Sequence, residues 1–164
     1  MKKLSLVLLT LLAGIAPAQA DDDECILQME ALKPVMREKI KNHLVKIYQD
    51  TRSISEWGEL EDGTRVIYEA GGCAHYSFSF RLENVPDEIP EMPDDPFALA
   101  LELLAKLPLQ DTANMEIIQR SLKEQQEKGF ATFQEDKAEF SCGDAFCSLE
   151  LKPDAITVDY DFAL

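Results

Sequence analysis

The residues of this chain whose types suit nucleophilic or metal chemistry are two histidines and four cysteines. His75 follows Cys73 by two positions, and a Cys–His pair can supply a nucleophile and its base. With Cys142 and Cys147 these two residues could also form a Cys3His zinc site, although the spacing matches no standard zinc motif. His43 is expected to be a hydrogen-bonded structural histidine on the apolar side of a helix.

Longer catalytic signatures are absent from the sequence. It contains no Gly-x-Ser-x-Gly elbow and no His-Glu-x-x-His metal motif. Carboxylates are abundant, with 31 Asp and Glu against 16 Lys and Arg, so pairs that resemble the acid pair of a glycosidase arise by chance. A small hydrolase is therefore kept only as an alternative.

The first 20 residues have the features of a secretory signal peptide. Lys2 and Lys3 precede an apolar run from Leu4 to Leu12, and Ala18-Gln19-Ala20 is a small-residue cleavage site. The apolar run is short for a helix that spans a bilayer. We expect residues 1–20 to be removed and the mature chain to reach a bacterial periplasm without stable membrane insertion.

The four cysteines are expected to form two disulfides in such an oxidising compartment. Cys142 and Cys147 flank a short turn and could bridge a hairpin, which leaves Cys25 with Cys73. Four cysteines allow three connectivities, so this pairing is a preference. It would remove the Cys73 nucleophile and the zinc ligands, so we predict no catalytic residue, no metal and no cofactor.

The chain is strongly acidic, with a formal net charge of −15. Removing residues 1–20 takes away Lys2 and Lys3 and no acid, which leaves −17 on the mature chain. Such a charge repels nucleic acid and anionic lipid headgroups and attracts basic proteins. The alternative is that the acidity only keeps the protein soluble.

The stretch from Gly63 to Glu83 predicts two strands joined at Gly71-Gly72. In the second strand the alternate residues from Tyr76 to Leu82 are apolar, and those from His75 to Arg81 are polar. This alternation predicts an antiparallel strand with one face in the core and the other open to water or a partner. The outward residues that we select as candidate partner contacts are Arg65, Ile67, His75, Ser77, Ser79 and Arg81.

Residues before this hairpin predict helices and one further strand. Apolar residues from Met36 to Tyr48 follow helical spacing, and residues 26–32 give a shorter apolar stripe. Ser53–Leu60 is predicted to be a strand that forms a meander with Thr64–Ala70 and Ala74–Glu83.

A proline-rich acidic connector, residues 86–94, follows the meander. Its prolines suit neither a central strand nor a helix, so we expect a stiff, extended segment. We expect one α+β domain over 21–164, with 21–85 and 95–164 as two halves joined by the connector. Carboxylates of this region are a second set of candidate partner contacts: Asp87, Glu88, Glu91, Asp94 and Asp95.

The second half predicts two helices followed by three or four strands. Asp95 and Pro96 are N-terminal signals for a helix that stops at Pro108, and Gly129 closes the next helix. The order of elements predicts an α+β fold, with an antiparallel sheet of about six strands covered on one face by helices, as a tandem helix-helix-sheet repeat. This layout is similar to that of secreted β-lactamase inhibitor proteins and of small periplasmic inhibitors, a likeness that carries over no residue and no target.

These features predict an exported, non-catalytic binding protein. We expect an inhibitor or immunity protein that neutralises a basic envelope-acting enzyme or toxin, using the outward sheet face or the connector. An accessory or assembly factor for a periplasmic envelope complex is the first alternative, and the hydrolase is the second. Nothing in the sequence predicts the oligomeric state.

Overall fold

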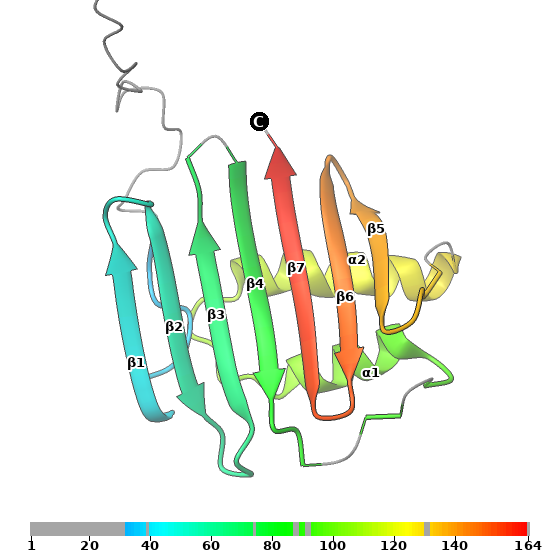
Figure 1. The fold of residues 1–164 in the computed structure, drawn as a ribbon, viewed down its shortest axis with the longest axis horizontal. Coiled ribbons are helices and arrows are strands. Elements are labelled where there is room, and N and C mark those ends of the chain that lie inside the picture. The colour runs from blue at the N-terminus through cyan, green and yellow to red at the C-terminus, as the bar shows by residue number, and fades with distance from the viewer. Residues whose placement is uncertain are drawn as a thin grey trace, which may run out of the picture.

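The computed structural model describes residues 32–38, 40–73, 75–86, 89–90, 93–129 and 132–163. These residues form an α+β fold, as predicted, with two helices packed against one face of an antiparallel sheet (Figure 1). The sheet has seven strands rather than about six. The elements are β1 Lys41–Tyr48, β2 Ser53–Glu59, β3 Arg65–Gly71, β4 His75–Glu83, α1 Pro96–Ala105, α2 Ala113–Lys128, β5 Lys137–Cys142, β6 Ala145–Lys152 and β7 Ala155–Ala163.

The sheet joins two antiparallel meanders, one from each half of the chain. The strand order is β1-β2-β3-β4-β7-β6-β5. The meanders meet where β4 pairs with β7 along its whole length, from His75 opposite Ala163 to Glu83 opposite Ala155. The chain reaches the far edge of the sheet through the connector and the two helices, and then returns strand by strand to β4 (Figure 1).

The core lies between the helices and the inner face of the sheet. The alternation predicted for β4 is confirmed, because Phe78, Phe80 and Leu82 are all at most 2% exposed. The buried helix residues Leu104 and Leu122 belong to the same core. Burial of such side chains removes apolar surface from water, which is the main favourable term in folding.

α1 begins and α2 ends where their sequence signals predict, whereas α1 ends at Ala105, before the predicted stop at Pro108. The Asp95 Oδ1 atom accepts a hydrogen bond from the Ala98 backbone N–H at 2.9 Å, and Pro96 is the first residue of α1. Gly129 ends α2 with a φ of 64°, a left-handed conformation that glycine adopts without a steric cost.

The predicted helix from Met36 to Tyr48 is wrong, because residues 41–48 form β1. β1 pairs with β2, with a register shift between Lys41 and Leu44, where Asn42 has a φ of 51°. This bulge is incompatible with a continuous helix. The described part of the first half therefore contributes strands only, and the tandem helix-helix-sheet repeat is not found there; the predicted apolar stripe at 26–32 lies, except for Leu32, outside the described residues.

A buried carboxylate holds the N-terminal segment, residues 32–38, against the sheet. Glu56 points to the core side of β2 and has no exposed surface. Its Oε2 accepts from the Val35 N–H at 2.6 Å, its Oε1 accepts from the Met36 N–H at 3.1 Å, and His43 Nε2 lies 2.7 Å from Oε1. His43 is thus hydrogen-bonded, as predicted, although it lies on a strand.

The N-terminal segment also bonds to the connection between the helices. Met36 forms a bridge with Leu109, and the Gln110 N–H donates to Val35 O at 2.7 Å. Glu56 therefore lies beneath a segment that closes one end of the core, and its carboxylate satisfies backbone N–H groups that no strand partner reaches.

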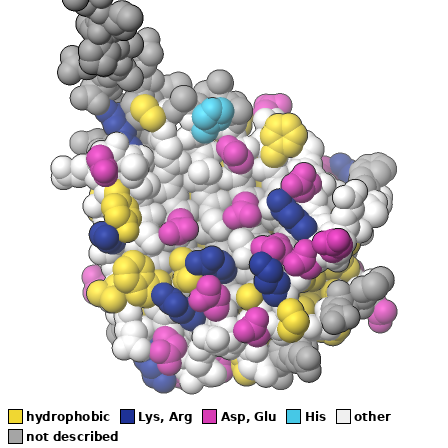
Figure 2. Space-filling view, viewed as in Figure 1, with side chains coloured by type: hydrophobic (Ala, Val, Ile, Leu, Met, Phe, Trp, Pro, Cys, Tyr) yellow, Lys and Arg dark blue, Asp and Glu magenta, His cyan; other side chains and the backbone are white. Residues whose placement is uncertain are grey.

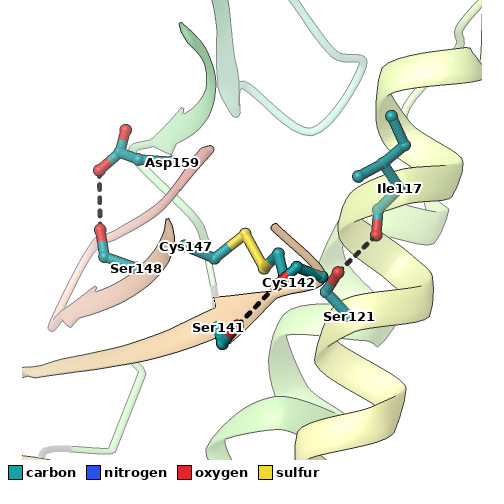
Figure 3. The surroundings of a disulfide bond; sticks show 8 residues. Ile117, Ser121, Ser141, Cys142, Cys147, Ser148 and Asp159 are labelled. Atoms are coloured by element: carbon teal, nitrogen blue, oxygen red, sulfur yellow. Dashed lines mark hydrogen bonds between the residues drawn. A yellow bond between two sulfur atoms is a disulfide. The ribbon is translucent and has the colours of Figure 1, made fainter. Parts of the chain in front are cut away.

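The predicted Cys142–Cys147 disulfide is confirmed, with an S–S distance of 2.02 Å. Both cysteines are buried and lie in phase with the core residues of β5 and β6, on the side of the hairpin that faces α2 (Figure 3). Cys73 is also disulfide-bonded. Its predicted partner, Cys25, lies outside the described residues.

Replacing Glu56 by Gln is expected to lower the free energy of unfolding by about 2–3 kcal/mol. Each carboxylate oxygen accepts from a different backbone N–H, so the amide must place its NH2 group against one of these donors. Urea denaturation would measure the loss. Glu59→Gln, on the exposed side of the same strand, is the control and should change stability by no more than about 0.5 kcal/mol; equal effects of the two substitutions would contradict the role given to Glu56.

Removing the Cys142–Cys147 disulfide by a double substitution to Ala should lower the free energy of unfolding by about 2 kcal/mol. The loop that it closes is short, with a sequence separation of 5, so the entropy that it removes from the unfolded chain is modest. Urea denaturation with an unchanged m-value would isolate this effect. A loss above about 5 kcal/mol would mean that the bond does more than restrain the unfolded chain.

Candidate partner-binding face

The face of the sheet away from the helices is the candidate functional site, and we call it the open face. Alternate residues of every strand point to it, and antiparallel pairing aligns them in rows that cross the sheet. Figure 2 looks onto this face, where Lys and Arg side chains gather away from the end that carries the histidine. The predicted contacts Arg65, Ile67, Ser77, Ser79 and Arg81 all lie on the open face, in two different regions.

In one half of the open face, the basic side chains are paired with carboxylates. Arg65 and Arg81 lie 3.6 and 3.2 Å from the carboxylate of Glu83, and Lys152 lies 2.7 Å from Glu150. Ile67, between Trp57 and Arg81 in its row, is only 7% exposed. This half therefore has its charges paired, and such exposed pairs contribute little energy individually.

The other half contains a shallow hollow of about 500 Å³. Serine and glycine residues of β2, β3 and β4 form its floor, and Glu69 of β3 and two aspartates of β7 lie in the same rows. The floor residues are Ser53, Ser55, Gly71, Ser77 and Ser79. The larger residues that line the hollow are Tyr48, Glu69, Asp159 and Asp161.

The hollow contains three carboxylates, Glu69, Asp159 and Asp161, and two of them accept hydrogen bonds from serines. The Ser55 hydroxyl donates to Glu69 Oε1 at 3.2 Å, and the Ser148 hydroxyl donates to Asp159 Oδ2 at 3.0 Å (Figure 3). Among the described residues, none of the ion pairs within 4.0 Å involves Glu69, Asp159 or Asp161. The hollow thus presents negative charge without a matching cation in that part of the chain.

Lys46 of β1 lies over the ring of Tyr48, which lines the hollow, and Lys137 lies on the edge strand β5. The pKa of Lys137 is raised above the ordinary value, chiefly by the hydrogen bond to Glu139 and to a smaller extent by the charges of Glu139, Asp159 and Glu150. The ammonium group is bonded to Glu139 at 2.8 Å, at the edge strand. Lys137 is therefore paired within its own strand, β5, and does not neutralise the carboxylates at the centre of the hollow.

An exposed aromatic side chain borders the hollow. Phe146 is 73% exposed and lies opposite Asp161 in the β6–β7 pairing. The neighbouring Cys147 points the other way into the core, where its disulfide to Cys142 ties the two strands of this hairpin together. The strand alternation and the disulfide together hold the Phe146 ring out on the open face.

Sequence reasoning missed Phe146, Tyr48, Asp159 and Asp161 as site residues. Apolar residues alternate with Asp159 and Asp161 in the sequence of β7, which indicates that both aspartates point outward, and an inward Cys147 implies an outward Phe146. What the sequence lacked was the pairing of β4 with β7, which brings Asp159 opposite Ser79 and Asp161 opposite Ser77.

His75 lies beyond the hollow, at the end of β4, and is exposed. The Cys73 thiol that would accompany it as a nucleophile is oxidised in a disulfide. Cys142 and Cys147 are bonded to each other, so the alternative Cys3His zinc set is not formed. Within the described ranges, no three His, Cys, Asp or Glu side chains are placed to hold a metal ion.

The connector lies at the opposite end of the strands from the hollow. Its described part is bonded to the β6–β7 turn, since the Val85 N–H donates to Asp154 O and the Ile89 N–H to Pro153 O. Asp95 caps α1 and accepts a further hydrogen bond from Gln126 at 2.8 Å, whereas Asp94 is exposed. Three of the predicted connector contacts, Asp87, Glu88 and Glu91, lie outside the described residues.

No family model, no curated protein and no solved structure matches this chain. Neither α1 nor α2 is long and apolar enough to cross a membrane, and the described residues contain no other helix that could.

Proposed function

We propose that this chain is a periplasmic, non-catalytic binding protein whose open face binds a basic protein, as an inhibitor or immunity protein that neutralises an envelope-acting enzyme or toxin. The observation that carries the proposal is the hollow itself, where Glu69, Asp159 and Asp161 have no cationic partner among the described residues. They stand on a sheet face that the helices leave uncovered. The proposed occupant is cationic because the charge of the hollow and of the whole chain is negative.

The shape and chemistry of the hollow suit long basic side chains. Serine hydroxyls both donate and accept hydrogen bonds, and carboxylates form the strongest pairs with Arg and Lys. A side chain that enters the hollow would reach Glu69 and Asp159 across Ser79, which lies between them in one row. The proposed partner, a basic enzyme that binds anions, would thus fill the hollow with its Lys and Arg side chains.

Phe146 supplies the apolar part of the proposed contact. Interface energies concentrate in a few aromatic and Arg residues, with other contacts serving to exclude water. Phe146 and Tyr48 lie in the same row across the sheet, which runs Tyr48-Ser53-Gly71-Ser77-Asp161-Phe146-Ser141. A basic surface with an apolar spot beside its cationic side chains would match this arrangement, because Phe146 lies opposite Asp161.

The partner can be identified by capture on the chain without residues 1–20, from periplasmic extract, first at low salt and then at high salt. The proposal requires a basic protein that binds in a fixed ratio and loses its enzymatic or toxic activity in the complex. Recovery of a non-enzymatic envelope assembly would instead favour an accessory factor. Turnover of a substrate by the chain alone, lost when a carboxylate is substituted, would favour the hydrolase.

Replacing Glu69 by Gln and both Asp159 and Asp161 by Asn should slow association with the captured partner on the order of tenfold at low salt and flatten its salt dependence. The cause is loss of electrostatic steering and of three groups that pair with cations. Surface plasmon resonance would measure the rates. The control replaces Glu38, Glu102 and Glu127 by Gln, which removes the same charge at exposed positions away from the open face; equal slowing by the control would remove the hollow from the mechanism.

Replacing Phe146 by Ala should speed dissociation on the order of tenfold or more, while the association rate and the stability of the free chain stay nearly unchanged. The ring is 73% exposed in the free chain, so its removal leaves no cavity in the core. Dissociation kinetics and urea denaturation, measured on the same variant, separate the two effects. An unchanged dissociation rate would show that Phe146 lies outside the contact.

A further inference from the structure

The edge strand β1 exposes apolar side chains on both of its faces. Leu44, on the open face, is 54% exposed, and Val45 and Ile47, on the core side, are 38% and 47% exposed. Among the described residues, the exposed large hydrophobic side chains are these three and Phe146. One strand therefore carries three of the four exposed large hydrophobic side chains in this part of the chain.

β1 is uncovered because the helical layer ends before it. Figure 1 shows α1 and α2 behind β4, β7, β6 and β5, with β1 lying beyond them. The N-terminal segment covers Ile54 and Glu56 of β2 but leaves the side chains of Val45 and Ile47 exposed. In the part of the chain that the structure describes, no strand pairs with the outer edge of β1, so this edge and its apolar side chains are open to another strand.

The opposite edge of the sheet is protected in the ordinary way. On β5, the side chains that point to the core, such as Ala138 and Phe140, are buried, and Phe140 packs edge-on against Phe97 of α1 at 5.6 Å between ring centres. Its outward side chains include Lys137 and Glu139, which form an ion pair. Charged outward residues and a covering helix are devices that prevent edge pairing, and β1 has only part of them.

We propose that β1 pairs with β1 of a second copy of this chain, antiparallel and around a two-fold axis perpendicular to the sheet. The basic partner proposed for the open face does not suit this edge, because β1 carries Lys41 and Lys46 and no acid. β1 is also the locally basic strand of a chain with a net charge of −15, so two acidic copies repel each other least there. A strand that pairs with its own copy offers the same apolar residues from both sides.

The bulge and Lys46 limit the register of this pairing. The bulge between Lys41 and Leu44 leaves residues 44–48 as the regular part of the strand. A register that sets Lys46 opposite itself is disfavoured by like charge, whereas a register centred on Val45 sets Val45 against its own copy and Leu44 against the stem of Lys46. The Lys46 ammonium already lies over the Tyr48 ring, 4.5 Å from its centre, so it is turned along its own strand.

This symmetry has a consequence for the open face. A two-fold axis perpendicular to the sheet keeps the open faces of both copies on the same side, in one continuous sheet. The dimer would then present two acidic hollows in the same direction, and a target with two basic patches could engage both. The pairing itself does not depend on the function proposed for the open face.

Sedimentation velocity of the chain without residues 1–20, over rising concentration, tests the pairing. We expect a mass of about twice that of one chain at high micromolar concentration, and a single-chain mass for Val45→Asp. Ser141→Asp, the matched substitution on the opposite edge strand β5, should leave the dimer intact. A single-chain mass of the unsubstituted protein at every concentration would overturn the proposal.

A second measurement locates the seam. Val45→Cys should be cross-linked to its own copy by a short homobifunctional maleimide, because the two-fold axis passes beside this residue, whereas Ser141→Cys should not. A dimer that persists in Val45→Asp, or equal cross-linking of the two cysteine variants, would show that the copies associate elsewhere. Capture of the basic partner by monomeric Val45→Asp would separate this proposal from the one made for the open face.

Discussion

The pairing of β4 with β7 is the interaction on which the rest of this structure depends. It joins the strands on either side of the helices into one sheet, with nine residue pairs from His75–Ala163 to Glu83–Ala155. The inner side of these two strands contributes core residues with no exposed surface, among them Phe80, Ile156 and Val158. The outer side sets the serines of β4 beside the aspartates of β7, so the hollow exists only where the two halves of the chain meet.

The distribution of charge on the open face follows from this pairing and from the chain's acidity. Where basic residues occur, as at Arg65 and Arg81, the register supplies Glu83 within pairing distance. Where small polar residues occur, the neighbouring carboxylates have serines as hydrogen-bond donors instead. A serine hydroxyl satisfies a carboxylate geometrically without neutralising it, so the two halves of the same face differ in what they can attract.

Local signals in the sequence predicted the elements that depend on local interactions. The alternation in β4, the cap of α1 at Asp95 and Pro96, the end of α2 at Gly129 and the disulfide across the β5–β6 hairpin all involve residues within a few positions of one another. The stretch from Met36 to Tyr48 failed because an edge strand exposed on both faces has no apolar side whose period can be recognised, and pairing with β2 decides its conformation. The role of Glu56 and the hollow could not be predicted from the sequence for a related reason. The Glu56 carboxylate bonds to backbone N–H groups 20 and 21 positions earlier, and Ser79 pairs with Asp159 across 80 positions.

The N-terminal segment illustrates what such distant contacts mean for the order of folding. Residues 32–38 leave the ribosome before any of their partners, yet Val35 and Arg37 bond to the connection at 108–111 and to Glu56 of β2. Contacts of such wide sequence separation form slowly, because a long loop must close before they contribute. This segment, although it is synthesised first, is therefore among the last to be fixed, and until it docks, the core side of β2 holds a carboxylate that lacks its backbone hydrogen-bond donors.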